Sequence, residues 1–138
     1  MEASPSFGDQ WASGEVDFSY DPPPVGEYAL LLLEAEAATG NDGYGFVLFR
    51  FQTVGYGAQK FEDYRSFSSD ARARAARKIC ERMGAYGPYP SADGLHAALQ
   101  PLVGRVYKAR IVQRGEYRNL FVDGVASPAD IARLSAAA

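Results

Sequence analysis

The sequence contains a single cysteine, Cys80, and a single histidine, His96, among its 138 residues. One cysteine excludes a disulfide within the chain and is typical of a protein in a reducing compartment. The apolar helix face around Cys80 favours a core position, and His96 is expected to be a surface or packing histidine. The acid pairs Glu34/Glu36 and Glu62/Asp63 lack the spacing of a metal site. We therefore expect no enzyme activity, no metal and no other cofactor.

Long apolar segments are also lacking. The longest apolar run, Ala29 to Leu33, has the length of a strand, whereas a membrane-spanning helix needs about 20 residues. The first residues do not combine a basic segment with an apolar one, as a secretion signal does. These features favour a cytoplasmic protein without a membrane partner.

The chain has no excess of positive charge, since its net charge is −3. This charge is unevenly distributed: residues 1–25 contain five acids and no base, whereas residues 26–125 contain 13 Lys/Arg and 11 Asp/Glu. Residues 105–118 alone contain five bases and one acid. The total argues against a strongly basic nucleic-acid binder but leaves room for a local basic patch.

Composition divides the chain into three parts. Residues 1–25 are predicted to form an acidic, proline-rich arm, whose aromatic residues suggest that Val16 to Tyr20 dock on the domain itself. Residues 26–125 are predicted to be the folded domain, and residues 126–138 a short helix with an alanine-rich tail.

Alternating apolar residues predict five strands in the domain. The clearest is Phe46 to Thr53, where Val47, Phe49 and Phe51 share one face. The others are 27–37, 60–67, 105–113 and 118–125; propensity alone favours a helix for 27–37, but the preceding prolines and the later strands favour a strand.

A helix is expected between the third and fourth strands. Ser69 is its N-cap and Gly84 ends it, while Ala75, Ala76, Ile79, Cys80 and Met83 form an apolar face. Three strands, one main helix and two strands is the order of the OB-fold, a mainly β, five-stranded barrel.

In OB domains the ligand lies on strands 2 and 3 and between the loops that join strands 1–2 and 4–5. Single-stranded nucleic acid needs aromatic rings for base stacking and bases for phosphate contacts, and residues of both kinds fall at these positions. The candidate nucleic-acid-binding residues are Tyr44, Phe46, Arg50, Lys60, Tyr64, Arg65, Lys108, Arg110, Arg114, Tyr117 and Arg118. Core positions are an equal alternative for Phe46 and Tyr64, and a solvated strand face is an equal alternative for Lys108 and Arg110.

Several short segments resemble a phage-encoded family of OB-fold single-stranded DNA-binding proteins, long catalogued only as a domain of unknown function. They are Val16–Phe18, Pro24–Tyr28, Phe49–Phe51, Gly55–Gly57, Arg72–Met83, Leu102–Val106 and Asn119–Val122. The resemblance implies sequence-tolerant single-stranded DNA binding in phage replication or recombination, inside a bacterial host cell, with a phage or host replication or recombination protein as a partner. Many single-strand binders have an acidic C-terminal tail, whereas here the acidic segment is at the N-terminus.

Other functions stay open at this stage. A structural or adaptor module would use the same barrel to bind a protein, and a sugar-binding barrel would use the same aromatic residues for stacking. RNA is the alternative to DNA, and the sequence does not decide whether the chain forms a homodimer.

Overall fold

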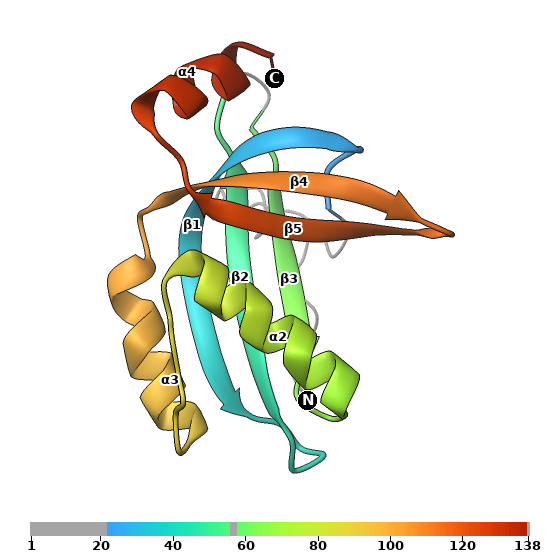
Figure 1. Ribbon diagram of the computed structural model, residues 1–138, viewed down its shortest axis with the longest axis vertical. Helices are drawn as coiled ribbons and strands as arrows, with labels where there is room; N and C mark the ends of the chain where they lie inside the picture. Colours follow the sequence, from blue (N-terminus) through green and yellow to red (C-terminus); the bar gives the residue numbers. More distant parts are fainter. Residues whose placement is uncertain (1–21, 56–57, 138) are drawn as a thin grey trace, which may run out of the picture.

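The computed structural model describes residues 22–55 and 58–137. Their elements form one open sheet with helices packed around it (Figure 1). The predicted arm lies almost entirely outside these residues, and so does the predicted docking of Val16 to Tyr20. The predicted turn at 55–57 is described only at Gly55.

Five antiparallel strands make up the sheet, in the spatial order β3-β2-β1-β4-β5. The strands are β1 (Gly26–Thr39), β2 (Gly45–Thr53), β3 (Lys60–Ser66), β4 (Val106–Arg114) and β5 (Tyr117–Val125). The prediction of a mainly β domain is confirmed, and so is the choice of strand over helix for residues 27–37. Tertiary pairing overrides the helix propensity of that segment.

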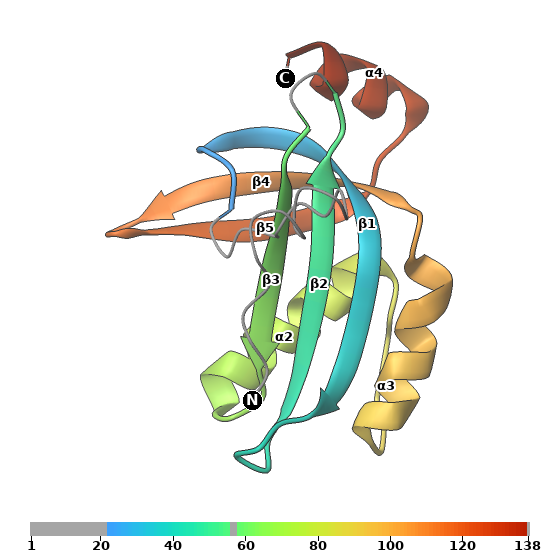
Figure 2. The ribbon, with the colours of Figure 1, turned by 180° about the vertical axis from the view of Figure 1, so that it is seen from behind.

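Strand β1 is long because it pairs with two partners along its length. Residues 26–31 pair with β4 and residues 30–39 pair with β2, with an irregularity in register between Leu32 and Glu34. A bulge of this kind bends a strand and increases its twist. The bend turns the β4–β5 hairpin across the other three strands (Figure 2).

Among the described residues, three helices accompany the sheet: α2 (Asp70–Met83), α3 (Ala92–Leu99) and α4 (Pro128–Ala137), with a short 3-10 turn, η1 (Gln100–Leu102), after α3. Helix α2 follows β3, as predicted. The Ser69 hydroxyl accepts a hydrogen bond from the Arg72 backbone N–H, and Gly84 ends the helix with a φ of 114°. Glycine adopts this left-handed backbone conformation with little strain.

The core lies between the inner face of the sheet and the helices. Val47, Phe49 and Phe51 are fully buried, which confirms the predicted inner face of β2. Helix α2 contributes Ala76, Ile79, Cys80 and Met83, as expected, and α3 contributes Leu95 and Leu99. Ala75 was expected on this apolar face of α2 but is exposed, because the buried stripe is only as wide as the contact with the sheet.

Cys80 is buried in the core, as predicted, and His96 is half-buried, which agrees with the expected surface or packing role. Burial raises the pKa of the Cys80 thiol to about 12, so the neutral thiol is the stable form. The Ala37 backbone N–H donates to His96 Nδ1 at 3.1 Å, which ties α3 to β1. No described helix is both long and apolar enough to cross a membrane.

Candidate nucleic-acid interface

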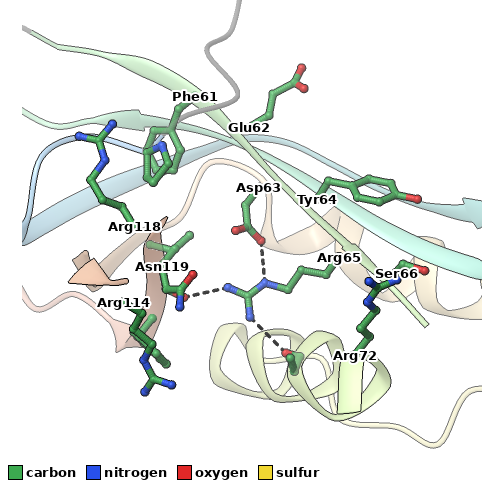
Figure 3. Close-up of a pocket in the computed structure, with 14 residues that line it drawn as sticks. Phe61, Glu62, Asp63, Tyr64, Arg65, Ser66, Arg72, Arg114, Arg118 and Asn119 are labelled. Carbon is green, nitrogen blue, oxygen red and sulfur yellow. Dashed lines mark hydrogen bonds and ion pairs between the residues drawn. The ribbon is translucent and has the colours of Figure 1, made fainter. Parts of the chain in front are cut away.

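The two edge strands of the sheet, β3 and β5, are linked by one side chain. Arg65 of β3 donates from Nη2 to the Leu120 carbonyl of β5 at 2.8 Å and from Nη1 to the Ala75 carbonyl of α2 at 3.3 Å. Its Nε donates to Asp63 Oδ2 at 2.8 Å. The Arg65 guanidinium therefore holds β3, β5 and α2 together by three of its donors (Figure 3).

This position of Arg65 differs from the predicted one. Arg65 was expected beside Tyr64 on the ligand-binding face, but it pairs across the sheet with the buried Val47, whereas Tyr64 pairs with Leu48 on the outer face. Successive residues of a strand point to opposite faces, so Tyr64 and Arg65 cannot share one. Arg65 thus braces the strands that form the site.

A groove of about 730 Å³ runs between β3 and β5, and the start of α2 borders it. From β3 it is lined by residues 61–66, from β5 by residues 118–121, and from α2 by Arg72 and Ala75. Arg114 of β4 and Pro22 complete the lining. Figure 3 shows Arg114 and Arg118 on one side of the Arg65 guanidinium and Arg72 on the other.

The groove has a net positive charge once the ion pairs of its acids are taken into account. Its two acids are already occupied, since Asp63 pairs with Arg65 and Glu62 pairs with Arg50. Arg72, Arg114 and Arg118 form no ion pair with a carboxylate of residues 22–55 and 58–137. Three cations are therefore available to an anionic ligand.

Aromatic side chains lie at both borders of the groove. On the β3 side, Tyr64 is 58% exposed and its ring centroid lies 5.3 Å from that of Phe46. On the β5 side, the guanidinium of Arg110 lies 5.5 Å and that of Arg114 lies 5.3 Å from the Phe121 ring centroid. Tyr117, at the tip of the β4–β5 hairpin, is 73% exposed.

Two of the predicted cations on the outer face lie away from the available positive charge. Arg50 is paired with Glu34 at 2.6 Å and with Glu62 at 2.9 Å, and its hydrogen bond to Glu34 is the main reason that its pKa is raised. Cross-strand neighbours of opposite charge explain this arrangement, since Arg50 pairs in register with both glutamates. Lys60 lies further along the same face, opposite Gln52.

The remaining predicted residues are dispersed. Tyr44 is 50% exposed in the loop between β1 and β2. Arg110 is paired with Asp123 at 3.1 Å. Lys108 lies near Asp130 of α4, a carboxyl whose pKa is lowered chiefly by the Ser127 backbone N–H and also by Lys108.

Of the predicted set, Tyr64, Arg65, Arg114 and Arg118 line the groove; Phe46 lies beside Tyr64, and Tyr117 pairs in register with Arg114. The groove residues that were not predicted include Arg72, Asn119 and Phe121. A signal for Phe121 was present, because Leu120 and Val122 alternate as core residues and leave 119 and 121 on the outside. No sequence signal placed the first turn of α2 beside β5.

In the part of the chain that the structure describes, no three His, Cys, Asp or Glu side chains are grouped to hold a metal ion. No protein-family model matches the sequence, and no curated protein matches it.

Proposed function

We propose that the domain is an OB-type barrel that binds single-stranded DNA in the groove between β3 and β5, without catalysis. The strand order β3-β2-β1-β4-β5 supports the fold assignment, and so does the bridge from Arg65 to Leu120 between the two edges. OB-folds are partly open five-stranded barrels in which a helix lies between the third and fourth strands.

One observation carries the proposal: three arginines without a carboxylate partner among the described residues line a groove, and the exposed ring of Tyr64 lies at its border. In this proposal Arg72, Arg114 and Arg118 contact phosphates of the strand. Tyr64 offers an exposed ring to an unstacked base, whereas the guanidinium groups of Arg110 and Arg114 lie over the Phe121 ring. Stacking contributes about 1–3 kcal/mol per base and tolerates any base, so this combination suits sequence-tolerant binding.

The same chemistry favours a single strand over a duplex. In a duplex the base faces are covered by their neighbours, and only phosphates remain for the arginines. A single strand satisfies both groups at once. By its resemblance to the phage-encoded family, the protein would act in DNA replication or recombination.

A titration of labelled oligo-dT against a duplex of equal length, followed by fluorescence anisotropy, tests this function. We expect tighter binding of the single strand, with log K falling linearly as log salt rises and a slope of about −0.7 for each phosphate contacted. Three arginine contacts would give a slope near −2.

Equal affinity for single strand and duplex would refute base stacking in the groove. Absence of binding to either at low salt would refute the function itself. A stable protein complex without oligonucleotide affinity would instead support the adaptor hypothesis.

A further inference from the structure

A second hollow, also of about 730 Å³, lies beside the groove on the same helix and strand. From α2 it is lined by residues between Arg74 and Met83, and from β5 by Asp123, Gly124 and Val125. Gly84, Tyr86 and Arg105 complete it. The groove proposed above touches α2 at Arg72 and Ala75 and β5 at 118–121, so the two hollows follow α2 and β5 in the same direction.

The second hollow is strongly basic. Its five cations are Arg74, Arg77, Lys78, Arg82 and Arg105, and its acids are Glu81 and Asp123. Asp123 is already paired with Arg110, and none of the five cations forms an ion pair with a described carboxylate. A cluster of unpaired like charges raises the local potential and attracts anions.

This clustering extends to the whole of the described domain. Eight of its 14 Lys and Arg line the two hollows and form no ion pair with a described carboxylate. Arg50, Arg65, Arg110 and Arg133 are ion-paired. Although the net charge of the chain is −3, its surface therefore has a basic track along α2 and β5.

Aromatic exposure accompanies the positive charge here too. Tyr86, which follows α2, is 72% exposed, and Val125 at the end of β5 is 61% exposed. Both line the second hollow. A large ring held in water beside unpaired cations repeats the composition of the groove and matches the requirements of a nucleic-acid strand.

We propose that the single strand continues from the groove between β3 and β5 over the second hollow, which we call the seam of α2 and β5. There Arg74, Lys78, Arg82 and Arg105 contact its phosphates, and Tyr86 stacks on a base. This inference rests on the proposed function. From Arg72 to Arg82, α2 rises about 15 Å. At 3.4 Å or more between successive phosphates, the seam accommodates roughly three to four further nucleotides.

The test compares an oligo-dT of about 5 nucleotides with one of about 12. Wild-type protein is expected to show a steeper salt dependence with the longer strand. The seam variant, Arg74→Ala/Lys78→Ala, should lose roughly 25-fold in affinity for the longer strand at 0.1 M salt. The slope of its log K against log salt should become shallower by about 1.4. Both positions are exposed on the helix, and alanine favours helix, so folding is preserved.

A charge-matched control is Arg133→Glu, which changes the net charge by the same two units on α4, a helix that packs on β1 and β4. It should leave the slope for the longer strand unchanged and shorter-strand binding within about twofold of wild type. The seam variant should likewise bind the shorter strand within about twofold of wild type.

The outcomes separate the two proposals. If wild type binds neither strand, the proposed function fails. If wild type binds both with equal slopes, or the seam variant loses equal affinity for both, the groove stands and the extended path is refuted. A seam variant that binds both strands normally but loses affinity for a polyglutamate peptide would assign the seam to an acidic protein segment instead.

Discussion

Replacing Arg65 by alanine is expected to lower the free energy of unfolding by about 2–3 kcal/mol. The guanidinium makes three hydrogen bonds, to Asp63, to the Ala75 carbonyl and to the Leu120 carbonyl. Removing it leaves Asp63, whose side chain is 17% exposed, without its counter-ion. Loss of one partner from a buried pair costs more than the pair itself contributes, and partial exposure reduces that cost here.

Urea unfolding followed by circular dichroism measures this effect as a lower midpoint at an unchanged slope. Arg65→Lys should restore only part of the loss, because an ammonium cannot present the planar fork that reaches three acceptors. The control is Arg72→Ala, which removes an exposed arginine of the same groove whose described contact is to Ser68 Oγ at 3.1 Å. A loss at Arg65→Ala no larger than that of Arg72→Ala would show that Arg65 does not hold the two edges together.

The double variant Arg114→Ala/Arg118→Ala is expected to weaken oligo-dT binding roughly 25-fold at 0.1 M salt. Each arginine that contacts a phosphate contributes about 0.7 to the slope of log K against log salt, so the slope should fall by about 1.4. Extended over the tenfold range from 0.1 M to 1 M salt, this difference gives the expected factor. Removal of the Arg114 guanidinium also uncovers part of the Phe121 ring. Bases can then stack on this ring, which limits the loss of affinity.

Anisotropy titrations at several salt concentrations provide the measurement, and the melting temperature checks the fold of each variant. Arg133→Glu, with the same change of net charge on α4, should keep the wild-type slope. A double variant that loses affinity without a change of slope would mean that Arg114 and Arg118 do not contact phosphates.

Much of the sheet and of α2 follows from local patterns in the sequence. Val47, Phe49 and Phe51 alternate with polar residues, and this period specifies both a strand and its buried face. Ser69 and Gly84 fix the ends of α2 because hydrogen bonding and backbone conformation at helix termini depend on single residues. These features need no knowledge of distant segments.

The candidate site was less predictable because it depends on register and on contacts between distant elements. The partners of Arg50 and Arg65 are set by how β2 aligns with β1 and β3 and by how α2 meets β5. Positive charge alone predicted that both arginines contact nucleic acid. In the structure Arg50 is ion-paired with two glutamates on the outer face, whereas Arg65 links the two edge strands. The basic side of α2 could not be assigned from the sequence, since nothing in the helix itself shows that β5 lies beside it.

The most direct test of the central claim is a titration of the ¹⁵N-labelled protein with a short oligo-dT, followed by amide chemical shifts. Binding in the proposed groove predicts the largest shift changes at residues 62–66 of β3 and 118–121 of β5, with small changes in α4. Changes confined to α3 and α4, with the amides of β3 and β5 unmoved at saturating oligonucleotide, would contradict it.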